Sequence, residues 1–149
     1  MALHKIGCNV IGYNYRQKAL QMGNEQRDLH LEKTVKEGDF DLVLYSKCNV
    51  VSYKTFEYIN SLTTTCLWFM DPLVSYNEEM RNKTQLVDYA CFDKKNVLEE
   101  AKKLNKKSYY ICEGFDSFTD KPYEEILQQY DISFIGNIYG ERQSLIDSI

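Results

Sequence analysis

The amino-acid sequence predicts an α/β fold with a Rossmann-like open parallel sheet and helices on both faces. Short apolar runs, rich in β-branched and aromatic residues, alternate along the chain with longer segments of helical composition. Short turns join these segments, which is the order expected of consecutive βαβ units. No repeat, low-complexity tract or flexible linker interrupts the alternation. We therefore expect one sheet whose neighbouring strands run parallel.

The predicted strands are apolar runs bounded by turn residues, and they cover residues 8–13, 40–46, 64–70, 87–92, 109–112 and 132–136. The run that begins at Thr64 contains the only tryptophan and has no charged residue before Asp71. Such a run is typical of a strand buried on both faces, so we expect it at the centre of the sheet. Pro72 ends the strand, because its ring removes a backbone donor and favours an extended conformation at Asp71.

The predicted helices occupy the segments between these runs, namely residues 2–6, 24–37, the segment after 52, 75–85, 96–104, 123–130 and 142–149. Ser52 is the expected N-cap of a helix whose inward face carries Phe56, Ile59 and Leu62. Ser75 and Glu78 have the spacing of a capping box, which predicts a helix that begins there.

The charge of the chain argues against a general nucleic-acid-binding protein. The net charge is −4 and the pI is about 5.2, whereas phosphate recognition needs a concentrated basic face. Lysines do cluster between residues 94 and 107, but glutamates lie among them. We interpret this cluster as the solvated face of a helix and its exit.

The cysteines and the apolar runs indicate a cytoplasmic protein without a membrane span. The five cysteines have wide, irregular spacing that fits no metal site, so we expect buried free thiols in a reducing compartment. The first residues are too short and too polar for a secretory signal. No apolar run approaches the roughly 20 residues that a membrane-spanning helix needs.

Asp71 is the first candidate functional residue. It stands where the predicted central strand gives way to a loop, which is where open α/β sheets bind ligands. Its carboxylate could orient an acceptor hydroxyl or remove the proton from it. The alternative is that Asp71 caps the turn that follows, as an aspartate before proline often does.

A second candidate loop follows the predicted strand 109–112 and contains Glu113, Gly114 and Asp116. Gly114 permits backbone conformations that other residues resist, which would let the loop approach a ligand closely. A plain connecting loop explains the same residues.

A third candidate lies between the last predicted strand and the last predicted helix, and it contains Gly136, Asn137, Tyr139 and Arg142. Backbone donors and the helix dipole can hold a phosphate at such a place. The sequence is neither a G-x-G-x-x-G fingerprint nor a P-loop, and a simple strand-to-helix turn is the alternative.

Four segments, taken in order and at their spacing, carry a resemblance to a known family: residues 2–10, 67–72, 87–93 and 131–142. With them the chain resembles the N-terminal half of GT-B-fold glycosyltransferases, in particular the group of the CgeB-like spore-maturation proteins. Such enzymes have two Rossmann-like domains. The first holds the acceptor, the second holds most of the nucleotide-sugar donor, and the sugar is transferred in the cleft between them.

The resemblance implies a domain boundary and a role for each candidate loop. Residues 1–130 would form the acceptor-side domain, without the usual first strand and its glycine-rich loop, and residues 131–149 would begin a donor-side domain. The acceptor side of the cleft would hold Asp71, Glu113, Gly114 and Asp116. The loop near the donor diphosphate would hold Gly136, Asn137, Tyr139 and Arg142.

The leading hypothesis is sugar transfer from a nucleotide sugar to a glycan or another hydroxyl acceptor, once a donor domain completes the enzyme. That domain would come from another chain or from a second copy in a homo-oligomer. No tightly bound cofactor and no metal ion are expected. The alternative is a non-catalytic α/β binding or interaction module derived from such an enzyme. A flavodoxin-like regulator is a third hypothesis, but it requires a phosphate loop that the sequence does not contain.

Overall fold

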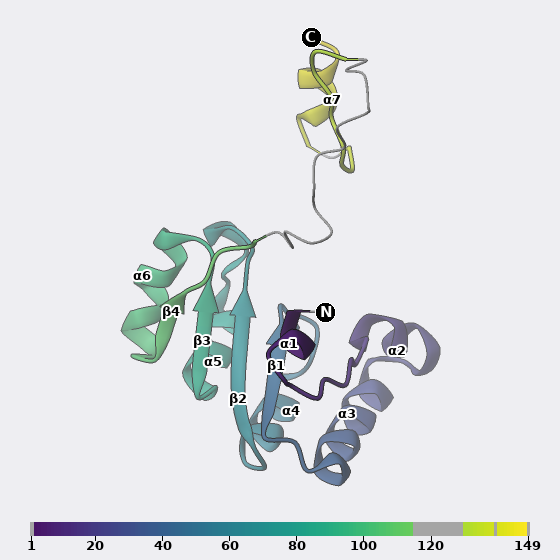
Figure 1. Cartoon of the computed structure of the whole chain (residues 1–149), viewed down its shortest axis with the longest axis vertical. Coiled ribbons are helices and arrows are strands. Elements are labelled where there is room, and N and C mark those ends of the chain that lie inside the picture. Colours follow the sequence, from purple (N-terminus) through teal and green to yellow (C-terminus); the bar gives the residue numbers. More distant parts are fainter. Residues whose placement is uncertain (1, 115–129, 139, 149) are drawn as a thin grey trace. The chain divides into compact units, whose positions relative to one another are not determined.

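The computed structural model describes residues 2–114, 130–138 and 140–148, and the chain forms two compact units, Met1–Phe115 and Asp116–Ile149. The first unit contains a four-stranded sheet. In the second unit the described residues include one short helix, α7 (Arg142–Ile146). All strands of the described residues therefore belong to the first unit (Figure 1).

The sheet is fully parallel and its strands follow one another in the order β1-β2-β3-β4 (Figure 1). The strands are β1 (Leu42–Ser46), β2 (Thr64–Phe69), β3 (Tyr89–Phe92) and β4 (Ser108–Tyr110). The helices that connect them are α4 (Tyr53–Asn60), α5 (Glu78–Leu86) and α6 (Lys95–Leu104). The predicted α/β class with a Rossmann-like open parallel sheet flanked by helices is confirmed, but the connecting helices do not lie on both faces as predicted.

The three connecting helices lie on one face of the sheet. The strand order advances in a single direction, and right-handed crossovers then place every connecting helix on the same side. Accordingly α4 packs against α5, and α5 against α6. Helix α3 (Asn24–Gly38) packs beside α4 and adds Leu31 and Val35 to the core. The hydrophobic core therefore lies between this helical layer and one face of the sheet.

Strand β2 is buried on the helical face alone. Thr65, Leu67 and Phe69 are buried, whereas the alternate residues Cys66 and Trp68 are only half-buried. The prediction that this strand is buried on both faces is wrong, because none of the connecting helices covers the second face. The position of β2 inside the sheet, between β1 and β3, is as predicted.

The second face, which we call the open face, carries residues that share one side of the sheet: Leu42, Leu44, Cys66, Trp68, Tyr89, Cys91 and Tyr109. Parallel pairing places Leu44 beside Cys66, and Cys66 beside Tyr89. Leu44 remains 44% exposed and Tyr109 50% exposed. The open face is therefore mostly apolar, exposed at Leu44 and Tyr109, half-buried at Cys66 and Trp68, and buried at Cys91.

The chain reaches the sheet through two further helices, α1 (Ala2–Lys5) and α2 (Tyr15–Met22). Helix α1 and the turn at Gly7, which has φ of +87°, agree with the sequence prediction. Helix α2 was not predicted. Its N-cap is Asn14, whose side chain accepts a hydrogen bond from the backbone N–H of Gln17 at 3.1 Å.

Asn77 caps helix α5, and the predicted capping box is wrong. The Asn77 side chain accepts a hydrogen bond from the backbone N–H of Met80 at 3.0 Å. Ser75 instead ends a 3₁₀ turn, Leu73–Ser75, which places it one turn before the helix begins. The cap predicted for α4 is confirmed, because Ser52 accepts from the backbone N–H of Thr55 at 3.2 Å.

Two strand predictions are wrong. In the described part of the chain, no backbone hydrogen bond joins residues 8–13 to β1, and Ile11 is 65% exposed. Short apolar runs predict extended backbone, but pairing also needs contact with a sheet edge, and here a pocket separates the two segments. Residues 132–136 are likewise irregular. The predicted helix 123–130 lies outside the described residues, except for its last residue.

Among residues 2–114, 130–138 and 140–148, no helix has the length and apolar character needed to cross a membrane. All five cysteines are free. Cys48 and Cys91 are buried as expected, whereas Cys8 and Cys112 are exposed.

Candidate functional site

The carboxyl ends of the strands place charged side chains at one edge of the sheet. We call this group the strand-end cluster: Lys47 after β1, Asp71 after β2, Asp93 and Lys94 after β3, and Glu113 after β4. Neighbouring strands lie about 4.8 Å apart, so these residues stand on adjacent loops. Open parallel sheets bind their ligands at this edge, which makes the cluster the candidate site.

Lys47 and Asp71 form an ion pair between the loops that follow β1 and β2. The Lys47 Nζ atom donates to Asp71 Oδ1 at 2.6 Å, and both side chains are about one-third exposed. The backbone N–H of Lys47 also donates to the carbonyl of Trp68 at 3.0 Å, which ties the loop to β2. Asp71 is thus held at the edge of the sheet, where a ligand can reach it.

The loop that presents Lys47 has an unusual backbone. Lys47 has φ of +63° and Cys48 has φ of +52°, so two consecutive residues other than glycine adopt the left-handed conformation. This conformation costs about 1–2 kcal/mol per residue, and such strain persists only where the surrounding structure enforces it.

Two buried cations hold this loop from the core side. Lys83 is fully buried, and its ammonium donates to the carbonyls of Cys48 and Asn49 at 3.3 and 3.2 Å. Arg27 is also fully buried, and its Nη2 atom donates to the carbonyl of Val50 at 2.6 Å. These bonds satisfy three consecutive carbonyls and fix the direction in which Lys47 leaves the loop.

Asp93 provides a second carboxylate at the same edge. Its side chain is 3% exposed, and one oxygen accepts a hydrogen bond from Lys94. The other oxygen, Oδ1, is buried and has no hydrogen-bond partner among the described residues. The hydrogen bond that Lys94 donates to Asp93 raises the pKa of the Lys94 ammonium, and the nearby charges of Asp93 and Glu113 add to this effect. Lys94 is therefore held in its charged form beside Glu113.

The strand-end cluster offers hydrogen-bond acceptors and charged donors side by side. Carboxylates accept hydrogen bonds from hydroxyl groups, and ammonium groups donate to hydroxyl or phosphate oxygens. Lys47 donates to Asp71 Oδ1, and the lone pairs of Oδ2 can accept from a ligand. Within residues 2–114, 130–138 and 140–148, no group of three metal-ligating side chains comes together. The arrangement suits a ligand with several hydroxyl groups.

Of the predicted acceptor-side residues, Asp71 lies at the carboxyl end of β2 as expected. Glu113 and Gly114 follow β4 and are exposed. The negative charge of Glu113 contributes to the raised pKa of the Lys94 ammonium. Asp116 lies outside the described residues.

The predicted donor-phosphate residues belong to the second unit. The Arg142 Nη1 atom donates to the carbonyl of Asn137 at 2.9 Å. A Cβ atom added to Gly136 would lie 3.7 Å from the same nitrogen. The structure thus brings Gly136, Asn137 and Arg142 together, and Tyr139 lies outside the described residues.

Sequence reasoning missed Lys47, Asp93 and Lys94. Lys47 and Asp93 directly follow predicted strands and Lys94 is the next residue after Asp93, so the strand ends themselves were the available signal. Lys94 was assigned to a solvated helix face, although it precedes α6 and pairs with a buried carboxylate.

Comparisons of the chain with protein-family models, with curated proteins and with solved structures find no match.

Proposed function

We propose that the first unit belongs to the acceptor-side domain of a GT-B-type glycosyltransferase, and that the strand-end cluster binds a hydroxyl-bearing acceptor such as a glycan. The observation that carries this proposal is the Lys47–Asp71 ion pair at the carboxyl ends of β1 and β2. It supplies a fixed, accessible carboxylate at the ligand-binding edge of an open parallel sheet. A carboxylate in that position can orient a hydroxyl and accept its proton.

In the proposed reaction the acceptor hydroxyl attacks the anomeric carbon of the donor sugar. The bond from that carbon to the nucleoside diphosphate breaks, and the hydroxyl proton passes to Asp71. Lys47 holds the Asp71 carboxylate through Oδ1, which leaves Oδ2 to face the hydroxyl. The nucleotide sugar is a substrate, and the chemistry requires no tightly bound cofactor or metal ion.

We further propose that residues 1–130 serve the acceptor and that residues 131–149 begin a donor-side domain in which Gly136, Asn137, Tyr139 and Arg142 approach the diphosphate. The hydrogen bond between Arg142 and Asn137 supports a compact loop there. The remaining donor-side elements would come from another chain or from a second copy, and the reaction would take place in the cytoplasm.

A non-catalytic binding or interaction module is the second candidate function. The open face favours it, because Leu44, Tyr89 and Tyr109 expose apolar surface of the kind that marks interaction sites. In this case the strand-end cluster would bind a ligand without converting it.

A ¹H–¹⁵N NMR titration of the protein tests the binding site. The probes are neutral hexoses and N-acetylhexosamines, a nucleotide sugar, and the nucleoside diphosphate alone. We expect saturable shifts of the amides in residues 47–51, 70–71, 93–95 and 111–114. Shifts confined to the opposite edge of the sheet, or none, would exclude this site. Binding without sugar transfer, in every assembly that supplies a donor domain, would favour the non-catalytic module.

A further inference from the structure

We propose that Cys66 and Cys91 form a binding site for a soft metal ion, Cu(I), on the open face of the sheet. Their sulfur atoms lie 3.9 Å apart, although the two residues are 25 positions apart in the chain. We call these two residues the thiol pair. The proposal is independent of the proposed function, since it concerns the open face and not the strand-end cluster.

Parallel pairing of β2 with β3 brings the thiol pair together. Cys66 pairs with Tyr89 and Cys91 pairs with Trp68, so the two cysteines are diagonal neighbours on one face of the sheet. Diagonal neighbours lie about 7–8 Å apart, whereas a disulfide between Cα atoms more than about 7 Å apart requires the backbone to move. The pair is therefore better suited to hold an ion between its sulfur atoms than to form a disulfide.

The distance between the two sulfur atoms fits two bonds to one metal ion. With metal–sulfur bonds of about 2.3 Å, the length known for zinc, sulfur atoms at this distance would subtend an angle of about 115° at the metal. This angle is close to that of an ion with three ligands in one plane. Two ligands would come from the thiol pair, and the third would come from the solvent side.

The set of ligands favours Cu(I) over other ions. Thiolates are soft ligands, and they select soft ions such as Cu(I) over Mg²⁺ or Ca²⁺. Zinc sites in proteins take three or four protein ligands. In the part of the chain that the structure describes, no third histidine, cysteine or carboxylate joins the thiol pair. Cu(I) has a filled d shell and binds with as few as two or three ligands, so the pair supplies what this ion needs.

An ion can reach the thiol pair from the open face. Cys66 is half-buried and Cys91 is 8% exposed, and none of the connecting helices covers this side of the sheet. Binding breaks the two S–H bonds and forms two S–Cu bonds, and both protons pass to the solvent. Copper stays in the Cu(I) state and sulfur is not oxidised, so the reaction needs no oxidant or reductant.

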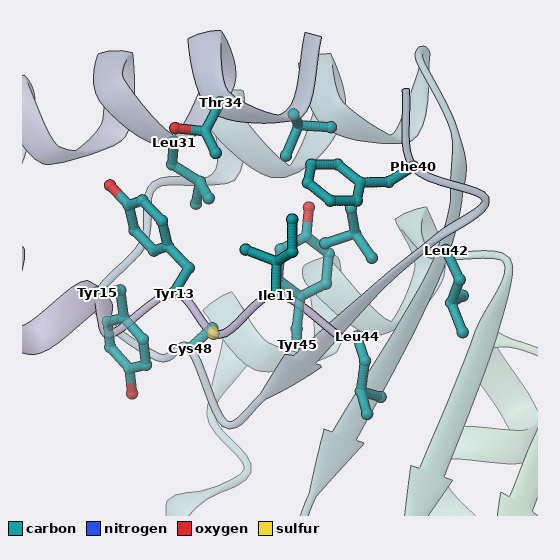
Figure 2. Close-up of a pocket in the computed structure, with 12 residues that line it drawn as sticks. Ile11, Tyr13, Tyr15, Leu31, Thr34, Phe40, Leu42, Leu44, Tyr45 and Cys48 are labelled. Carbon is teal, nitrogen blue, oxygen red and sulfur yellow. The ribbon is translucent and has the colours of Figure 1, made fainter. Parts of the chain in front are cut away.

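Cys48 provides the matched control for the thiol pair. It is buried in the loop after β1, beside the pocket that Figure 2 shows, and its thiol donates to the carbonyl of Ser46 at 3.5 Å. Cys48→Ala therefore removes one thiol, as a substitution in the pair does, without touching the proposed site.

The experiment is an anaerobic titration of the protein with Cu(I) held by the chromogenic chelator bicinchoninate. The background variant carries Cys8→Ala and Cys112→Ala, which remove the exposed thiols. We expect it to take one Cu(I) per chain from the chelator. Loss of an outer-shell partner already weakens metal binding about 10–100-fold, so Cys66→Ser and Cys91→Ser should each weaken it by more than about a hundredfold. Cys48→Ala should stay within about threefold of the background variant.

A ¹H–¹⁵N NMR spectrum of the background variant with and without Cu(I) locates the ion without a substitution in the pair. Cu(I) is diamagnetic, so the amides near it shift without broadening. We expect shifts in residues 65–69 and 89–92. The proposal is overturned if the background variant takes no Cu(I), if the shifts lie only in residues 46–49, or if Cys66→Ser binds as tightly as Cys48→Ala.

Discussion

The ammonium of Lys47 lies 2.6 Å from a carboxylate oxygen of Asp71, although the two residues follow different strands. This contact depends on the left-handed backbone of Lys47 and Cys48, which Lys83 and Arg27 enforce through the loop carbonyls. The ion pair at the surface is thus positioned by cations in the core. Ligand binding at this edge and the stability of the fold are linked through one short loop.

The ion pair itself should contribute little to stability. Lys47→Met and Asp71→Asn should each change the free energy of unfolding by less than about 1 kcal/mol, because both side chains are partly exposed and water screens them. Urea denaturation monitored by circular dichroism measures the change. A loss above about 2 kcal/mol would mean that the pair is structural.

Lys83 should matter far more to the fold. Lys83→Met removes the donor for two carbonyls in a fully buried position, so we expect a loss of about 2–3 kcal/mol in urea denaturation. The matched control is Lys33→Met on α3, whose side chain is 72% exposed and which should stay within about 0.5 kcal/mol. Equal effects of the two substitutions would show that the loop does not need the buried cation.

Phe56 should be a major core residue, and Leu62 should not. Phe56 is fully buried, and its ring stacks on that of Tyr45 with the ring centroids 3.9 Å apart. Phe56→Ala should therefore lower the free energy of unfolding by about 3–5 kcal/mol. Leu62 lies beyond the end of α4 and is 43% exposed. Leu62→Ala should therefore cost less than about 1 kcal/mol in the same assay. Similar losses would mean that Leu62 packs in the core as Phe56 does.

Cys91 should react with thiol reagents at lower pH than Cys48. Cys66 and Cys91 lie on the open face with their sulfur atoms 3.9 Å apart, and the hydrogen bond from Cys66 lowers the pKa of Cys91 to about 7. A lowered pKa means that the reactive thiolate appears as the pH rises through about 7. Burial raises the pKa of Cys48 to about 12, so Cys48 should stay unreactive.

Mass spectrometry after brief iodoacetamide treatment between pH 5 and 9 measures this difference. Cys8→Ala and Cys112→Ala remove the exposed thiols from the background. Cys66→Ala removes the hydrogen bond and should move the Cys91 profile to higher pH. An unchanged profile in Cys66→Ala would contradict this assignment.

The sequence was most informative where local chemistry decides the structure. The strands β1, β2 and β3 and the Ser52 cap were predicted because an apolar run bounded by turn residues, and a capping side chain, depend on a few neighbouring residues. The extended run 8–13 was assigned to the sheet wrongly, since pairing depends on which edge the segment reaches. The open face was also missed, because the direction of the strand order is a property of the whole chain.

The candidate site was predicted only in part, for the same reason. Asp71 follows a strongly apolar strand and directly precedes a proline, and both features are local signals. Lys47, the ion-pair partner of Asp71, was not predicted. The direction of its side chain depends on a left-handed backbone, which Lys83 on α5 supports through a hydrogen bond to the loop. The Asp93 Oδ1 atom is buried without a hydrogen-bond partner among the described residues. Sequence spacing does not reveal which side chains are buried in this way.

The central claim is that the Asp71 carboxylate binds the hydroxyl groups of an acceptor. The measurement that tests it most directly is the affinity of the sugar with the largest NMR shifts, compared between Asp71→Asn and Asp41→Asn. Asp41 is an exposed carboxylate at the opposite end of β1. We expect Asp71→Asn to weaken binding about tenfold, as for a hydrogen bond to a charged group, and Asp41→Asn to leave it unchanged. Equal affinities of the two variants for this sugar would contradict the claim.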